Sequence, residues 1–102
     1  MRVLMTTDTV GGVWTFTKEL ARQLLDGGAA VALVSFGRDP SREQRLWASR
    51  MRQQYGPSFT YEASLAPLEW MNDNERAYET GEELLLEIAG RFKPDVLHAN
   101  QY

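Results

Sequence analysis

The chain has 102 residues, 43% of them hydrophobic, with a formal net charge of −3 at pH 7 and no cysteine. This length predicts one small domain, and the interspersed charges provide no basic surface for nucleic acid or an anionic membrane. The lack of cysteine excludes disulfides and thiolate metal sites, and no apolar run fits a signal peptide or a membrane span, so we expect a cytoplasmic protein.

The first predicted unit is a strand, a glycine turn and a helix. Val3 to Thr7 form a short apolar strand that continues through Asp8 to the paired glycines Gly11 and Gly12, and the helix opens at Val13. Apolar residues then recur at helical spacing until the glycine pair at 27 and 28 ends the helix. These apolar positions are Phe16, Leu20, Ala21, Leu24 and Leu25.

A second strand and a second helix follow. Ala30 to Phe36 is a nearly continuous apolar run, which is typical of a parallel strand buried on both faces and completes a right-handed βαβ unit. Asp39-Pro40 predicts the N-cap and first position of the next helix, which Gly56-Pro57 ends. One face of this helix carries Leu46, Trp47, Met51 and Tyr55.

The rest of the chain adds a strand, a loop, a long helix and a last strand. The alternation of Phe59 to Tyr61 predicts a short third strand. The apolar residues of Glu62 to Asn74 follow neither the helical nor the strand period, which predicts a loop packed on the domain. A long amphipathic helix is expected from Glu75 to Phe92, and Lys93-Pro94 breaks it before a fourth strand over Asp95 to Ala99.

This pattern predicts an α/β fold, a three-layer Rossmann-like half-domain with helices on both faces of a parallel sheet. Right-handed crossovers make 3-2-1-4 the economical strand order, with the switch point between strands 1 and 4. Ligands of such sheets bind at the carboxyl ends of the strands beside the switch point. We therefore expect the segments Asp8 to Trp14 and His98 to Tyr102 to converge on one crevice.

The glycine pair is the strongest candidate for ligand binding. Glycine permits backbone angles and close approaches that other residues resist, and a helix start presents unpaired N–H groups and a positive dipole end. A phosphate or sugar hydroxyl fits there, and a Cβ at Gly12 is expected to block both the turn and that approach. A tight βα turn alone explains the pair equally well.

Two better-known nucleotide sites are disfavoured. The chain lacks G-x-G-x-x-G, and its second strand ends in Ser35-Phe36-Gly37 without an acidic residue for a ribose, which argues against a dinucleotide fold. No G-K-[ST] follows the glycines, which argues against a P-loop.

Three other residues near the carboxyl ends of the first and fourth strands have both a structural and a functional interpretation. Asp8 either binds an acceptor hydroxyl or accepts N–H bonds of its own loop, and the second is slightly favoured. Trp14 either stacks on a sugar ring or packs in the core. His98 is expected in a buried strand, where a core histidine is favoured over a catalytic base. A solvated helix face is predicted for Arg42, Arg45, Arg50 and Arg52.

Two segments resemble a known family. Met1 to Met5, leading through Gly11-Gly12-Val13, and the run Lys93 to Asn100 together resemble the N-terminal half of a family 4-like GT-B glycosyltransferase. The glycine pair opens the first helix, and P-D-V-[hydrophobic]-H closes the fourth strand at the expected distance. Leu68 to Asp73 also resembles a segment of some bacterial members, and the resemblance spans the whole chain.

The resemblance implies an enzyme of two facing Rossmann-like domains, the N-terminal one mainly for the acceptor and the C-terminal one for a nucleotide sugar. It implies transfer of the sugar to a hydroxyl acceptor, with retention and without a required metal. Gly11 and Gly12 match glycines whose backbone lies close to the donor diphosphate and the acceptor. Asn100 stands where many relatives have a second histidine, although its side chain can still bond a hydroxyl. The expected substrate-binding set is Asp8, Gly11, Gly12, Val13, Trp14, His98 and Asn100, with no catalytic residue, metal or cofactor assigned.

The family's C-terminal domain, with its paired glutamates for the donor, has no counterpart in the sequence. Stabilising a departing nucleotide diphosphate needs both domains, so we expect residues 1–102 to be a partial N-terminal domain that is inactive alone. An exposed edge on the fourth strand then favours a homodimer. The alternatives are a small flavodoxin-like or response-regulator-like binding or interaction module, and a structural half-domain that needs a partner chain. A regulator needs clustered acidic residues where Asp8 stands alone.

Overall fold

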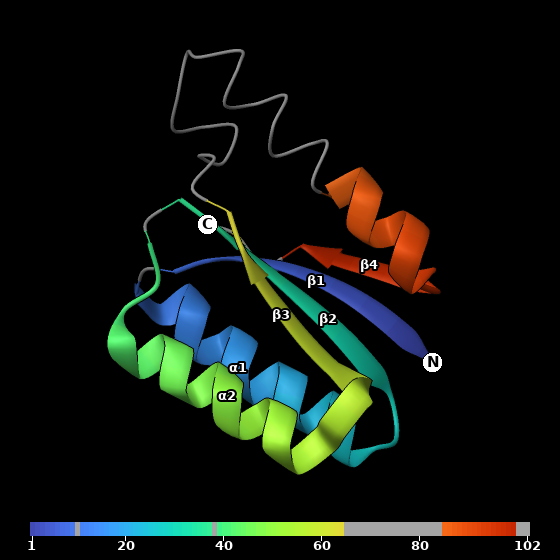
Figure 1. Cartoon of the computed structure of the whole chain (residues 1–102), viewed down its shortest axis with the longest axis horizontal. Coiled ribbons are helices and arrows are strands. Elements are labelled where there is room, and N and C mark those ends of the chain that lie inside the picture. The colour runs from blue at the N-terminus through green and yellow to red at the C-terminus, as the bar shows by residue number, and fades with distance from the viewer. Residues whose placement is uncertain (10, 38, 65–84, 100–102) are drawn as a thin grey trace.

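The computed structural model describes residues 1–9, 11–37, 39–64 and 85–99. Within these ranges, helices enclose a parallel sheet (Figure 1). The elements in chain order are β1 (Arg2–Asp8), α1 (Gly11–Asp26), β2 (Ala30–Phe36), α2 (Arg42–Tyr55), the 3-10 turn η1 (Gly56–Ser58), β3 (Phe59–Ala63), a helix over 85–92 and β4 (Val96–Ala99). No helix in the described ranges is long and apolar enough to cross a membrane.

The sheet has four parallel strands in the order β3-β2-β1-β4, as predicted. β1 lies inside the sheet, where Val3 pairs with Val31 of β2 on one side and with Val96 of β4 on the other. The strand order reverses between β1 and β4, which confirms the predicted switch point. It does not fit a flavodoxin-like outline, in which the first strand lies between the second and the third.

Helices cover both faces of the sheet. α1 and α2 lie on one face, and helix 85–92 lies on the other (Figure 1). Because side chains alternate along a strand, Val3 and Met5 join the core under α1 and α2, whereas Leu4 packs in a second core with Ile88 of helix 85–92. This burial on both faces explains the continuous apolar runs of the inner strands and confirms the three layers.

Helix α1 begins at Gly11, within the glycine pair rather than after it as predicted. Its end is as predicted: Gly28 has a φ of +94°, and its N–H donates to the carbonyl oxygen of Leu25 at 3.0 Å. The Ala29 N–H donates to the carbonyl oxygen of Leu24, also at 3.0 Å, which completes a Schellman motif. The motif requires a left-handed backbone, which glycine adopts without strain.

One predicted core residue of α1 is exposed. Phe16 has 58% of its surface exposed, so its assignment to the buried face is wrong. The side of α1 turned toward the sheet instead carries Trp14, Thr17, Ala21 and Leu25. The helical period was identified correctly, but the buried stripe is rotated, which leaves Phe16 on the flank of the helix.

Helix α2 starts after an N-cap at Ser41, so the predicted start at Asp39-Pro40 is wrong. Ser41 Oγ accepts from the Gln44 backbone N–H at 3.2 Å, and the Gln44 side chain accepts from the Ser41 backbone N–H at 2.7 Å. This capping box satisfies backbone donors that a proline start leaves open. The Asp39 carboxylate instead pairs with Arg45 at 2.6 Å. Gly56, with a φ of +60°, ends the helix as predicted.

Strand β3 is longer than predicted. Glu62 and Ala63, expected in a loop, continue the strand and pair with Val34 and Ser35 of β2. The rest of the predicted loop and the beginning of the predicted long helix fall at 65–84, outside the described residues. The segment 85–92 is helical, as predicted.

Candidate functional site

The predicted site lies at the carboxyl ends of β1 and β4. β1 ends at Asp8 and leads into α1 at Gly11, while Ala99 at the end of β4 pairs with Thr6 of β1. Because the two strands are parallel neighbours, the segments that follow them leave the sheet at the same edge. The structure places the end of β4 beside Thr6, two residues before the end of β1 from which the chain leads into α1 (Figure 1). Asn100 lies outside the described residues.

Two fully buried threonines hold the first turn of α1 against β1. The hydroxyl oxygens of Thr7 and Thr17 are 2.9 Å apart. Thr17 Oγ1 donates to the Val13 carbonyl at 2.7 Å, and Thr7 Oγ1 donates to the Asp8 carbonyl at 3.0 Å. Each hydroxyl has one proton, so at most two of these three bonds form at a time. Neither residue was predicted from the sequence. The available signal was a threonine inside the apolar stripe of α1, since a buried hydroxyl needs a partner.

Asp8 is buried at the end of β1, with 4% of its surface exposed. A buried carboxylate is stable only when other groups bond to it, and Asp8 does interact with its neighbours. This favours the structural interpretation of Asp8 that the sequence left open. Its negative charge, placed just before α1, also reduces the positive potential at the start of the helix.

Trp14 is a core residue. It is 6% exposed, and its ring lies edge-on to Trp47 at 5.4 Å and to Tyr61 at 6.2 Å. Trp47 in turn lies edge-on to Phe59 at 5.7 Å. Aromatic pairs in this geometry stabilise a core beyond their buried area. The geometry therefore supports packing, and not stacking on a sugar ring, as the role of Trp14.

Gly12 is the open part of the site. It lies in the first turn of α1 without a left-handed φ, so its backbone suits any residue. A Cβ at this position would meet no atom of the described residues within 4 Å, apart from its chain neighbours and the backbone of its own helix. The expectation that a side chain at Gly12 blocks the turn is therefore wrong. The lack of a side chain at Gly12 still allows another group to come close to the N–H groups of the helix start.

His98 is exposed, like every described residue of β4, so the prediction of a buried histidine is wrong. Its neighbours Val96 and Leu97 are 42% and 62% exposed. The apolar run of β4 resembled an inner strand, but within the described residues β4 pairs with β1 alone. The register places His98 beside Met5, on the face that α1 and α2 occupy. The imidazole therefore lies on an exposed strand beside Met5, three residues before β1 ends at Asp8.

The edge combines two kinds of hydrogen-bonding group. The first turn of α1 supplies backbone N–H groups and contains no acidic residue, and the exposed His98 imidazole on β4 adds two ring nitrogens that can hydrogen-bond. Within the described ranges, no cluster of three or more histidine, aspartate or glutamate residues could hold a metal ion. This set of groups suits a ligand that is rich in hydroxyl or phosphate oxygens.

The chain matches no family model, no curated protein and no solved structure. The resemblance to glycosyltransferases therefore rests on the residues of this sequence alone. What the structure establishes is a small Rossmann-like α/β domain with a four-strand parallel sheet in the order 3-2-1-4.

Proposed function

We propose that the chain is the acceptor-side, N-terminal half of a retaining GT-B glycosyltransferase, which transfers a sugar from a nucleotide sugar to a hydroxyl acceptor. In this proposal the first turn of α1 and the exposed face of β4 bind the acceptor, and a second Rossmann-like domain binds the donor. The strand order supports the proposal, as do the motifs at Gly11-Gly12 and Lys93 to Asn100.

The observation that carries the proposal is the open position of Gly12. Glycine in a helix interior costs about 0.5–1 kcal/mol of stability relative to alanine, and this is the upper limit for Gly12 in the first turn of α1. Neither the backbone angle nor any neighbouring atom of the described structure requires glycine there. In this proposal a bound ligand provides the reason, because it can come closer to the bare backbone than a Cβ would allow.

The described carboxylate at this edge, Asp8, favours an uncharged acceptor over a charged donor. The buried Asp8 carboxylate weakens the attraction that a helix start exerts on a phosphate, whereas an uncharged hydroxyl is less affected. His98 adds a group that hydrogen-bonds a hydroxyl in either direction. A sugar or polyol acceptor fits this combination better than a diphosphate does.

Amide NMR of the isolated chain tests this assignment. Methyl α-glucoside, methyl α-mannoside and inositol are titrated at millimolar concentrations, beside a nucleotide sugar. We expect at least one polyol to shift the amide signals of Gly12 and His98, with a much smaller effect of the nucleotide sugar at the same residues. Unchanged signals at this edge with every polyol would contradict an acceptor site.

In this proposal catalysis requires both the acceptor-side chain and a donor-binding domain. The isolated chain should show no turnover of a radiolabelled nucleotide sugar, and a version joined to a donor-binding domain should gain it. Turnover by the isolated chain would refute the division.

The exposed edge of β4 supports an association of two copies through that edge. Val96 and Leu97 present apolar surface beside backbone groups that a second strand can pair with. Light scattering over a range of concentrations should detect a dimer, which Leu97→Lys should weaken. A monomeric mass at high concentration would contradict this association.

A further inference from the structure

The free edge of β3 offers backbone groups at the opposite side of the sheet from β4. Within the described sheet, β3 pairs with β2 alone. The Ser64 N–H donates to the Ser35 carbonyl at 2.8 Å, and alternate residues of a parallel strand turn both backbone groups to the same neighbour. Tyr61 and Ala63 therefore turn their N–H and C=O groups to the open side. No residue of the described ranges bonds to those groups.

Helix α2 forms one wall of a groove beside this edge. The groove has a volume of about 620 Å³. Its α2 side carries Arg45, Ser49, Arg52 and Gln53, and its β3 side carries Thr60 and Tyr61. All four α2 side chains can donate hydrogen bonds, so the wall is suited to accepting groups of a ligand.

A second groove follows the same edge on the other face of the sheet. It has a volume of about 360 Å³ and lies between β3 and helix 85–92, with Glu62 and Arg91 in its lining. Arg52 and Tyr61 line both grooves, so the two meet at the strand edge. A strand added to β3 would send successive side chains alternately into one groove and the other.

The charge of this region is opposite to that of the whole chain. α2 contains four arginines and one glutamate, in a protein of net charge −3. All four arginines are exposed, as predicted, and Arg45 and Arg91 have carboxylate partners in Asp39 and Glu62. Arg52 has no ion pair with any described residue. Among the described residues, Arg52 is therefore a cation without a carboxylate partner at the point where the two grooves join.

We propose that the β3 edge binds an extended acidic peptide by strand addition, with a carboxylate of the peptide on Arg52. The free N–H and C=O groups of Tyr61 and Ala63 match another peptide backbone, whereas a nucleic acid has no such alternation of donors and acceptors. A second copy of this chain is disfavoured, because pairing two β3 edges about a twofold axis brings two basic α2 helices together.

The test uses a fluorescent eight-residue peptide that alternates glutamate with valine. Anisotropy at low ionic strength should show saturable binding to the chain. The same peptide with lysine in place of glutamate should not bind, and neither should one that is N-methylated at two consecutive central nitrogens. The methylated peptide keeps the charge and loses the backbone bonds, so it separates strand addition from charge attraction.

Matched variants locate the contact. Arg52→Gln should lower the affinity for the acidic peptide about fivefold, as expected for the loss of an exposed ion pair. Arg50→Gln removes an exposed arginine of the same helix that lines neither groove, and should leave affinity unchanged. Ala63→Pro removes an outward N–H without breaking a bond to β2, and should also weaken binding. Circular dichroism checks that each variant is folded.

Three results would overturn the proposal. The folded wild-type chain could fail to bind the acidic peptide at low ionic strength. Arg50→Gln and Arg52→Gln could weaken binding equally, which would reveal diffuse charge attraction. A single-stranded RNA of equal charge could bind more tightly than the peptide and depend on Arg52, which would assign the surface to nucleic acid.

Discussion

The amino-terminal ends of α1 and α2 meet the same requirement in opposite ways. A helix leaves its first N–H groups without partners inside the helix. α2 satisfies them with its own side chains, through the capping box of Ser41 and Gln44, and carries Glu43 in its first turn. α1 has no acidic residue in its first turn, and Gly12 leaves the surface above that turn bare. Within the described residues, α2 therefore has a side-chain cap at its start, whereas the start of α1 carries a glycine whose Cβ position is open.

Contacts on the buried side of α1 nevertheless hold the start of the helix firmly. Trp14 is packed between Trp47 and Tyr61, and Thr17 contacts Thr7 of β1. A bare outer surface on a fixed inner one is what a binding site needs, because the donors are already in place before the ligand arrives.

The largest expected effect concerns the inner face of α1. Trp14→Ala should lower the free energy of unfolding by about 3–5 kcal/mol, because it removes the centre of the aromatic cluster. Phe16→Ala is the control on the same helix, and its exposed ring should contribute little. Urea unfolding measures both. A small loss for Trp14→Ala would mean that the ring is not held by packing.

The threonine contact should have a smaller effect. Thr17→Val keeps the shape of the side chain but leaves the buried Thr7 hydroxyl with one partner fewer, so unfolding should become easier by about 1–2 kcal/mol. Thr15→Val, at an exposed position of α1, should have almost no effect. Equal stability of the two variants would show that the contact does not fasten the helix start.

One substitution removes the side-chain cap at the start of α2. Ser41→Ala removes the N-cap acceptor and should cost about 1 kcal/mol of unfolding free energy. Ser41→Asp keeps an acceptor and should retain most of the stability. If both variants are equally stable, the capping box does not distinguish the two helix ends.

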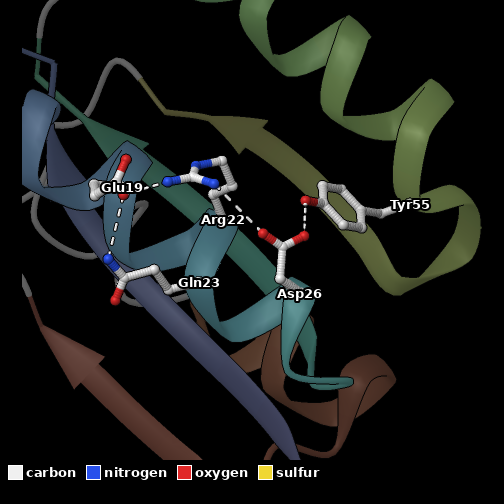
Figure 2. A network of polar contacts seen from close by, with 5 residues as sticks. All are labelled: Glu19, Arg22, Gln23, Asp26 and Tyr55. Carbon is white, nitrogen blue, oxygen red and sulfur yellow. Dashed lines mark hydrogen bonds and ion pairs between the residues drawn. The ribbon is translucent and has the colours of Figure 1, made fainter.

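Contacts at the carboxyl ends of α1 and α2 predict that the stability of the fold depends weakly on pH. The Tyr55 hydroxyl donates to Asp26 of α1, and Asp26 also pairs with Arg22 at 3.5 Å, within the network of Figure 2. The hydrogen bond to Asp26 raises the pKa of Tyr55 above its ordinary value. A pKa that is higher in the folded state adds stability below the ordinary tyrosine pKa, about 10, and this stability is lost as pH rises through the folded value.

Burial raises the pKa of Tyr61 as well, so both tyrosines make stability fall at alkaline pH. Thermal melts from pH 8 to pH 11 should therefore show a decline above about pH 10, which Tyr55→Phe reduces without removing. An identical decline in Tyr55→Phe would show that the contact with Asp26 does not persist in solution.

Local and topological signals predicted most of the fold. The bounds of β2 were predicted to the residue, because a continuous apolar run between Gly28 and Gly37 is a strong local pattern. The order 3-2-1-4 follows from the handedness of crossovers and needs no tertiary contact. The start of α2 was missed because Asp39-Pro40 offers a competing local signal, and the capping box of Ser41 prevails over it.

The site was less predictable, because exposure depends on what packs nearby. The apolar pattern of β4 is the same for an inner strand and an edge, so the exposure of His98 could not be foreseen. The burial of Asp8 and the exposure of Phe16 depend in the same way on tertiary neighbours. Gly12 shows a further limit: sequence identifies a glycine at the site, but only the structure shows that its backbone does not require one.

The most direct test compares Gly12→Ala with Gly90→Ala. Both glycines lie in helices, and a Cβ at either would meet no atom of the described residues within 4 Å outside its own helix. Each variant should therefore be as stable as the wild type or more stable by up to about 1 kcal/mol. NMR titration with the polyol that shifts the Gly12 amide should then show lost or strongly weakened binding in Gly12→Ala and unchanged binding in Gly90→Ala. Full binding in a stably folded Gly12→Ala would contradict the claim that the start of α1 is kept bare for a ligand.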